Sequence, residues 1–545
     1  MIDHRVHSSS FRHRDHALVL MAAMSMLAVT FFALQSEPTI DWLKLPDAKS
    51  LTRFAERACT EHRLKTGEVP EWPQRLVAQA HVYNREFRRA RRVAQPLTGV
   101  WRATFETTVV QVEYEQTGSI VELPLVGTRQ LSSDSTDDEI WDVITIAGLA
   151  KGLASAGQFE QARIVLKSVE DSRGFKTILM DHLIEAARMQ IERNDKDGAN
   201  RSLTECMTLR ERLRKSSFRF VEQIISVAEL WQRLGKAEEA VQAAEMLHCK
   251  LKSDEEEEGA FYFNAKGAAR LGRFFASIGN RERSSAAFRE ALRLAEDAFE
   301  RASKENPNYS DMERKHFVGL LAQIAAWQFE SGWQTEADQT MNRVLTEMEM
   351  KGDPNHIVER PSTGSLVNDM ILSQFPPTTM GADRDYQLLG LVGKLAPSRY
   401  RQAILRIVSE MKGDYWKLCG LRDWSRSDPS AGSVWEPILS EIESRVTTLA
   451  SAEERASRLT IIAEIRSVAN DAFIARKAFT QAISASSQTE SRTQHQEIAR
   501  IQIRSGYFED AFTTIGKIPD AENRLLPLGE LALAVAKREF ESKKR

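Results

Sequence analysis

One spacing of residues recurs along this 545-residue chain and constrains its fold more than any other feature. A small residue is followed seven positions later by a residue typical of turns, and five positions after that by a second small residue. In one example these residues are Ala150, Gly157 and Ala162. Recurrence of this kind is the signature of a repeat architecture, in which one supersecondary unit is used many times.

The spacing occurs eight times. The first small residues are Ala78, Ala150, Ala187, Ala228, Gly272, Ala325, Ala463 and Ala499. The turn residues are Arg85, Gly157, Asn194, Gly235, Gly279, Gly332, Asn470 and Gly506. The second small residues are Ala90, Ala162, Ala199, Ala240, Ser284, Ala337, Ala475 and Ala511. Gly and Asn tolerate the left-handed backbone conformation that ends many helices, so each unit reads as two helices joined at that turn.

Small residues on facing helices allow the two helices of a unit to approach closely, while larger neighbours fill the groove between them. A single helical hairpin cannot bury its own apolar face, so successive hairpins must stack. We therefore predict an all-α fold, an α-α superhelical solenoid of helical hairpins.

At these turns the chain resembles the tetratricopeptide (TPR) family. The stretches Gly157–Ala162, Gly235–Ala240 and Gly506–Ala511 look like the inter-helix turn of that family. The chain departs from the family pattern because most intervals exceed the usual repeat of about 34 residues. In addition, most units lack the early Trp, and the closing Pro is rare. The resemblance implies a divergent array with a concave groove formed by the first helices.

In TPR proteins the residue after the first small residue commonly points into that groove. The basic residues at this position are the candidate groove contacts Lys151, Arg188, Arg273 and Arg500. Charge in a groove steers encounter and selects partners. The resemblance therefore implies a protein or peptide partner, with some preference for negative groups.

The N-terminus carries a targeting signal. Residues 17–34 contain no charged side chain and, as a helix, would span about 27 Å, close to the thickness of a bilayer core. The tail 1–16 is basic, which places it in the cytoplasm and the repeat domain outside it, in the periplasm of a bacterium. We predict a single-pass membrane anchor. A cleaved signal peptide remains the alternative, although the residues after Phe32 make a poor cleavage site.

The remaining chain divides at interruptions of the spacing. A first TPR-like array covers 38–350, with an atypical segment at 100–140 that reads either as a β-hairpin or as a degenerate repeat. Pro and Gly residues at 351–385 predict a break with a short helix near Ser365–Gln374. A second helical sub-solenoid covers 386–545, with TPR-like units at 459–545, a loop at Asp423–Trp435 and a polar C-terminal cap helix at Leu525–Lys537.

Neither composition nor motifs indicate catalysis. The net charge of −3 argues against general nucleic-acid binding. No phosphate-binding loop, nucleophile elbow or HExxH zinc motif is present, and the four cysteines are far apart. No cofactor or metal site is predicted. The favoured function is a non-catalytic, membrane-anchored scaffold.

Two alternatives remain open at this point. The first is an enzyme or carbohydrate-binding protein that uses the atypical segments 101–126 or 386–435. The second is a cytoplasm-facing assembly adaptor, in which the orientation of the anchor is reversed.

Overall fold

The structure, a computed structural model, describes residues 41–97, 99–117, 146, 150, 153–154, 157–167, 175–211, 218–253, 261–305, 310–349, 380–489 and 493–544. The chain divides into two units, Met1–Leu45 and Pro46–Arg545, and every described helix belongs to the second. Within these residues all regular structure is helical, as predicted, and no strand occurs. No described helix has the length and apolarity to cross a membrane. The predicted anchor at 17–34 lies outside the described residues.

Most helices come in pairs that contact one another. In the first half these helices are α2 (Ala48–Thr66), α3 (Glu71–Tyr83), α4 (Phe87–Ala94), α5 (Gly99–Thr117), α7 (Phe159–Lys167), α8 (Phe175–Glu192), α9 (Lys196–Glu211), α10 (Phe218–Arg233), α11 (Ala237–Ser253), α12 (Phe261–Ser277), α13 (Arg281–Glu305), α14 (Ser310–Glu330) and α15 (Gln334–Glu349).

In the second half they are α17 (Met380–Leu395), α18 (Arg401–Glu410), α19 (Asp414–Ser427), α20 (Gly432–Val446), α21 (Ala452–Val468), α22 (Ala472–Ser486), α23 (Gln494–Arg504), α24 (Phe508–Gly516) and α25 (Ala521–Lys544), with 3₁₀ turns at Ala396–Ser398 and Pro429–Ala431.

The turn predicted in each unit has the same backbone structure. All eight predicted turn residues have positive φ, from 61° at Asn194 to 82° at Gly506. At Gly235 the N–H donates to the carbonyl of Gln232, and the next N–H, of Lys236, donates to Trp231. The same pair of hydrogen bonds recurs at the other seven turns. This is the Schellman arrangement, which satisfies carbonyls at the end of the first helix, so the spacing located the turns correctly.

The small residues lie where the helices of a unit meet. The second small residue is fully buried in all eight units, including the non-alanine Ser284. The closest approach is between α12 and α13, where a Cβ added to Gly272 would lie 2.9 Å from the ring of Phe288. The chain therefore forms a helical repeat, in which hairpins of one design bury a shared core.

The Gly272→Ala variant is expected to lower the free energy of unfolding by about 1–2 kcal/mol. Overpacking a filled core costs roughly 1–3 kcal/mol, and the gain of about 1 kcal/mol in helix propensity offsets only part of that cost. Chemical denaturation measures the change, and Phe288→Leu in the same chain should restore part of the loss. Equal or greater stability of Gly272→Ala alone would contradict the close approach.

A second set of contacts joins neighbouring units. The first helices of successive units contact each other in the series α8, α10, α12, α14, α17, α19, α21, α23 and α25. One continuous apolar core extends through this part of the chain, from Met180 to Ile501. The first helices thus form one layer and the second helices another.

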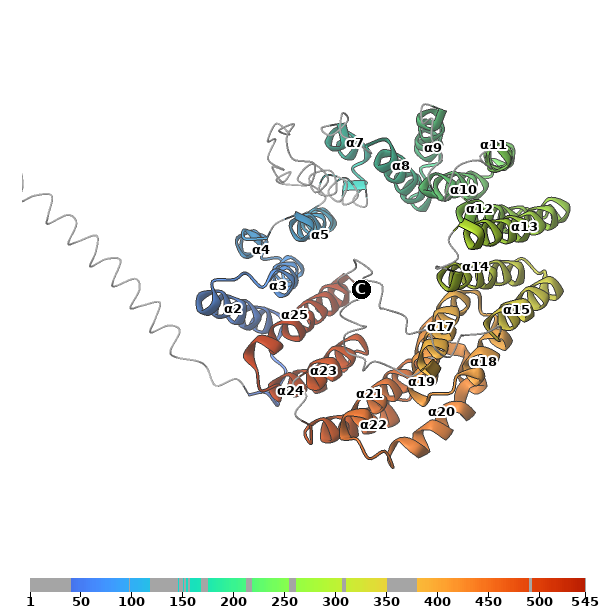
Figure 1. Ribbon diagram of the computed structural model, residues 1–545. Helices are drawn as coiled ribbons and strands as arrows, with labels where there is room; N and C mark the ends of the chain where they lie inside the picture. The colour runs from blue at the N-terminus through green and yellow to red at the C-terminus, as the bar shows by residue number, and fades with distance from the viewer. Residues whose placement is uncertain are drawn as a thin grey trace, which may run out of the picture. The chain divides into compact units, whose positions relative to one another are not determined.

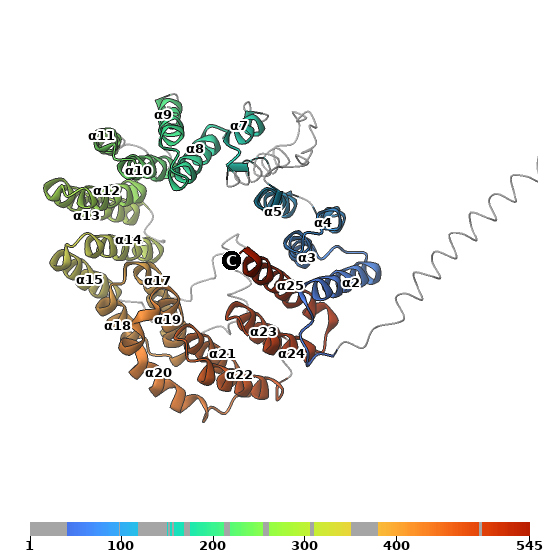
Figure 2. The same ribbon diagram turned by 180° about the vertical axis from the view of Figure 1, so that it is seen from behind.

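The two ends of the array also meet. Helix α25 contacts α2 and α3, and both views show it beside them (Figures 1 and 2). The Ala48 N–H donates to a carboxylate oxygen of Glu539 over 3.0 Å, and the rings of Tyr83 and Phe540 lie 5.5 Å apart edge to face. A Cβ at Gly529 would lie 3.2 Å from the carbonyl oxygen of Pro73. The prediction of a polar cap at Leu525–Lys537 was therefore wrong, because this helix packs on the first unit.

Three other predictions need correction or completion. The atypical segment is helical as far as Thr117, which removes the β-hairpin alternative there, while 118–145 lies outside the described residues. Asp423–Trp435 is not a loop: it comprises the end of α19, a 3₁₀ turn and the start of α20. Helix α17 begins at Met380, inside the predicted break, while Ser365–Gln374 lies outside the described residues.

The structure also contains a unit that the spacing missed. Arg399 has positive φ, and the residues seven before and five after it, Val392 and Ile404, are fully buried. Helices α17 and α18 therefore follow the spacing of the other units with a larger residue at each small position. The turn itself differs, because the Tyr400 N–H donates to the Ser398 hydroxyl and not to a carbonyl at the end of α17.

Candidate functional site

The predicted groove cations are engaged in ion pairs wherever they are described. Arg188 lies 2.5 Å from Glu185 on its own helix, and Arg273 of α12 lies 3.1 Å from Glu330 of α14. Arg500 of α23 donates from two nitrogens to Glu530 of α25, over 3.0 Å and 3.1 Å. Lys151 lies outside the described residues. Arg273 and Arg500 thus link neighbouring first helices, while the Arg188 pair lies within α8.

A larger group of cations surrounds Arg273 on α12. Lys266, Arg270 and Arg273 follow the helical spacing of four and three residues, so they share one face of α12. Two carboxylates of α10 approach this face: Glu222 pairs with Lys266 over 3.3 Å and with Arg270, while Glu229 lies 3.9 Å from Arg270. Burial, and then the charge of the neighbouring Arg273, lower the pKa of Arg270 to about 10.

Helices α14 and α17 continue this face with very small residues. Gly319 lies on α14, and Gly390 and Gly393 are exposed on α17. Lys394 extends from α17 over Gly319, where an added Cβ would lie 2.1 Å from its Nζ. Burial, and then the charge of Lys266, lower the pKa of Lys394. Among the described residues no carboxylate lies within ion-pair distance of Lys394. We call Lys266, Arg270, Arg273, Lys394 and the three glycines the α12–α17 patch.

The sequence spacing found only Arg273 of this patch. Lys394 lies two residues after Val392, which occupies the first small position of its unit. Six other units have a buried apolar residue at this position: Ala80, Leu230, Phe274, Trp327, Ile465 and Ile501. A lysine at a position that is apolar in the other units could have identified Lys394 from the sequence. That comparison is possible only once the unit at Arg399 has been recognised.

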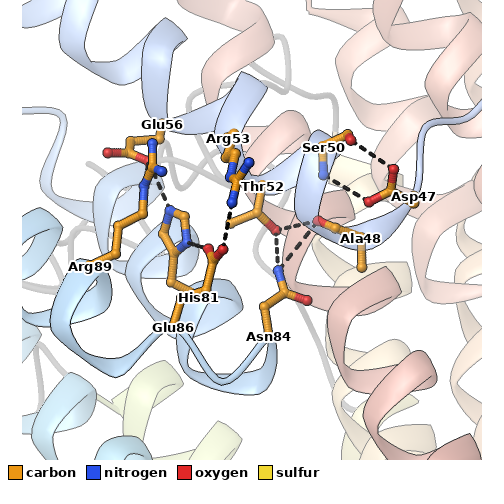
Figure 3. A network of polar contacts seen from close by, with 10 residues as sticks. All are labelled: Asp47, Ala48, Ser50, Thr52, Arg53, Glu56, His81, Asn84, Glu86 and Arg89. Atoms are coloured by element: carbon orange, nitrogen blue, oxygen red, sulfur yellow. Dashed lines mark hydrogen bonds and ion pairs between the residues drawn. The ribbon is translucent and has the colours of Figure 1, made fainter.

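A polar network ties α2 to α3 and α4 (Figure 3). The His81 side chain is fully buried, with Nδ1 2.7 Å from Glu86 and Nε2 2.9 Å from Glu56. Arg89 donates to Glu56 over 2.7 Å, and Arg53 donates to Glu86 over 2.9 Å. Since both ring nitrogens face carboxylate oxygens, a ring that donates from both satisfies every group.

The same network continues towards the start of α2. The Asn84 side chain donates to the Thr52 hydroxyl over 2.9 Å, and that hydroxyl donates to the Ala48 carbonyl over 2.6 Å (Figure 3). Because the Ala48 N–H is bound by Glu539, polar contacts connect three segments: the start of α2, the turn after α3, and α25.

Acid is expected to destabilise this end of the array. Burial raises the pKa values of Glu56 and Glu86. Hydrogen bonds from His81, Arg89 and Arg53 outweigh that effect, so both pKa values lie below their ordinary 4.5. The unfolded chain therefore binds more protons, and stability falls as pH drops below about 4.5 through the folded values. Melting temperatures from pH 7 to pH 3 should fall less steeply for Glu56→Gln, and equal slopes would contradict the assignment.

Metal-ligating groups and thiols are the next candidates for chemistry in the described residues. No cluster of three or more His, Cys, Asp or Glu side chains there has the geometry to hold a metal ion. Cys59, Cys206 and Cys419 are buried and unpaired, and burial raises the pKa of Cys59 to about 12, which keeps that thiol protonated.

A small pocket between α7, α8 and α9 contains His182, Arg163 and Gln190. Both ring nitrogens of His182 lack a hydrogen-bond partner. Burial and the nearby Arg163 lower the pKa of His182 to about 4, which leaves the ring neutral at pH 7. This pocket lies outside the atypical segments 101–126 and 386–435.

Comparison with known proteins gives little further information. No family model and no curated protein matches the chain. Among solved structures the chain is similar to a "Circular tandem repeat protein with novel repeat topology and enhanced subunit contact surfaces", with 15% identity over 91% of this chain and 98% of that one. The TM-score is 0.20, so the two backbones do not superpose as a whole.

Proposed function

We propose that this protein is a non-catalytic scaffold that binds a protein or peptide partner along the layer of first helices. The observation that carries the proposal is the continuous series of contacts from α8 to α25, which aligns one face of each first helix with the next. Repeat arrays of this kind use such extended surfaces for binding. The charged and glycine-rich α12–α17 patch lies on this layer.

The finer assignment is a TPR-like α-α solenoid held at a membrane. The left-handed turns with identical hydrogen bonds support the TPR-like reading, since the family places a Gly-led turn at this point of each unit. The apolar stretch 17–34 supports a single-pass anchor, with the array on the extracytoplasmic side. Protease protection in intact cells and spheroplasts tests the orientation, and digestion of the array only after the cytoplasm is opened would support the adaptor instead.

Site-directed photocrosslinking in membranes tests the binding surface. A photoreactive residue is placed at Ser226 or Gln323, on the first-helix layer, or at the control positions Glu300 and Lys304, on the second helix α13. The proposal expects adducts with the same partner from the first two positions and none from the controls. Equal labelling from both layers, or labelling from α13 alone, would contradict the proposal that the partner binds on the layer of first helices.

A further inference from the structure

The α12–α17 patch contains two glycines that the fold itself does not require. Gly390 and Gly393 lie inside α17 and have ordinary helical φ, and within the described chain no side chain or other helix comes within 4 Å of the place where a Cβ would be. Glycine within a helix is unfavourable compared with alanine. At Gly272 the close ring of Phe288 explains the glycine, but no neighbour explains Gly390 or Gly393. A close approach from outside the described chain would explain both.

The charges beside these glycines indicate what approaches. Lys394 is the i+4 neighbour of Gly390 and reaches over Gly319 towards Lys266. Tyr386, which is 48% exposed, is the i−4 neighbour of Gly390, so an aromatic side chain and an ammonium flank the glycine face. Burial, and then the repulsion from Lys266, lower the pKa of Lys394, and an added negative charge beside the ammonium would act against both effects.

We propose that an acidic, extended segment of a partner protein docks on the α12–α17 patch. Its carboxylates pair with Lys394 and Lys266, and its backbone lies over Gly390 and Gly393. The inference rests on the proposed scaffold function and assigns it one site and one partner chemistry. Positive charge selects the carboxylates, and the missing side chains allow the backbone to approach closely.

Fluorescence anisotropy with the full chain in detergent tests the site. The probe is a fluorescein-labelled ten-residue peptide of alternating Glu and Gly, and its comparison peptide has Gln in place of Glu. The Glu peptide should bind and the Gln peptide should not. Lys394→Gln should weaken binding about tenfold, the effect of losing one close charge pair. The control Lys304→Gln, at an exposed lysine of α13, should bind like the parent chain.

A glycine variant separates binding from folding. Gly390→Ala with Gly393→Ala should raise the melting temperature, because alanine favours the helix, and should weaken binding of the Glu peptide at least several-fold. A stabilised variant that binds normally would overturn the close approach. Equal binding of both peptides, or an unchanged affinity of Lys394→Gln, would overturn the charge assignment.

The chain's own acidic run, Asp254–Glu258, is the competing occupant. If replacing it with Ser and Gly raises the affinity of the Glu peptide, that run occupies the patch and the partner assignment is wrong. An unchanged affinity supports a partner. If the peptide does not bind while Gln323 still crosslinks a partner, this inference fails and the scaffold proposal stands. If both results are negative, both fail.

Discussion

A chain that ends at Asp520, and so lacks α25, is expected to lose the folded structure of α2, α3 and α4. Helix α25 buries five large apolar side chains, each at most 6% exposed: Leu525, Leu528, Leu531, Val535 and Phe540. At about 1.5–3 kcal/mol for each, an upper estimate of their contribution is roughly 8–15 kcal/mol. This matches the whole stability of a typical domain, so the first unit should not survive the loss.

The position of α25 explains why the effect should be local. It contacts both α2 and α3, and the contact with α3 is as extensive as that between the paired helices of other units. Helices from opposite ends of the chain thus complete one unit together. In a repeat array each unit depends mainly on its neighbours, so the units around α12 and α14 should remain folded.

Hydrogen exchange measures this prediction. In the shortened chain, amides of α2 to α4 should exchange near the unfolded rate, while those of α12 and α14 keep their protection. A chain that ends at Glu541 is the matched control, because it keeps Glu539 and Phe540 and loses only the last residues. Normal protection of α2 to α4 in the chain ending at Asp520 would show that α25 is not needed there.

The local parts of this fold could be predicted from the sequence because they depend on neighbouring residues. The spacing placed the left-handed residue correctly even at Arg85, where the residue type argues against it. It missed Arg399 because Val392 and Ile404 replace the small residues on which the search depended. Both of these larger residues are fully buried, so the same positions accept larger side chains, and a spacing defined by small residues does not find such units.

The long-range parts could not be predicted in this way. The hydrogen bond between Ala48 and Glu539 joins residues 491 positions apart. The composition of α25 does not distinguish a helix that caps the array from one that packs on the first unit. The ion-pair partners of the candidate groove contacts could not be predicted for the same reason. The sequence predicts Arg500 as a candidate groove contact, but its partner Glu530 belongs to a helix whose position depends on packing.

Replacement of His81 by Phe is expected to lower the free energy of unfolding by about 3–6 kcal/mol, because the ring makes two hydrogen bonds to carboxylates and each contributes about 1.5–3 kcal/mol. The ring of Phe fills a similar volume, so the loss comes from the two hydrogen bonds. Glu86 Oε2 would lose its hydrogen bond while Oε1 keeps Arg53, and Glu56 Oε2 would keep Arg89 but lose the ring. Both carboxylates are mostly shielded from water, which makes the missing donors costly.

Three matched measurements make this prediction specific. In urea denaturation, the Glu86→Gln variant should lose less than His81→Phe, because an amide can still hydrogen-bond the ring. The acid dependence should also weaken in His81→Phe, since the hydrogen bonds that lower the pKa values of Glu56 and Glu86 are gone. His182→Phe serves as the control, because neither nitrogen of that buried ring has a partner to lose. An equal loss of stability in His81→Phe and His182→Phe would attribute the effect to packing and remove the role assigned to the two carboxylates.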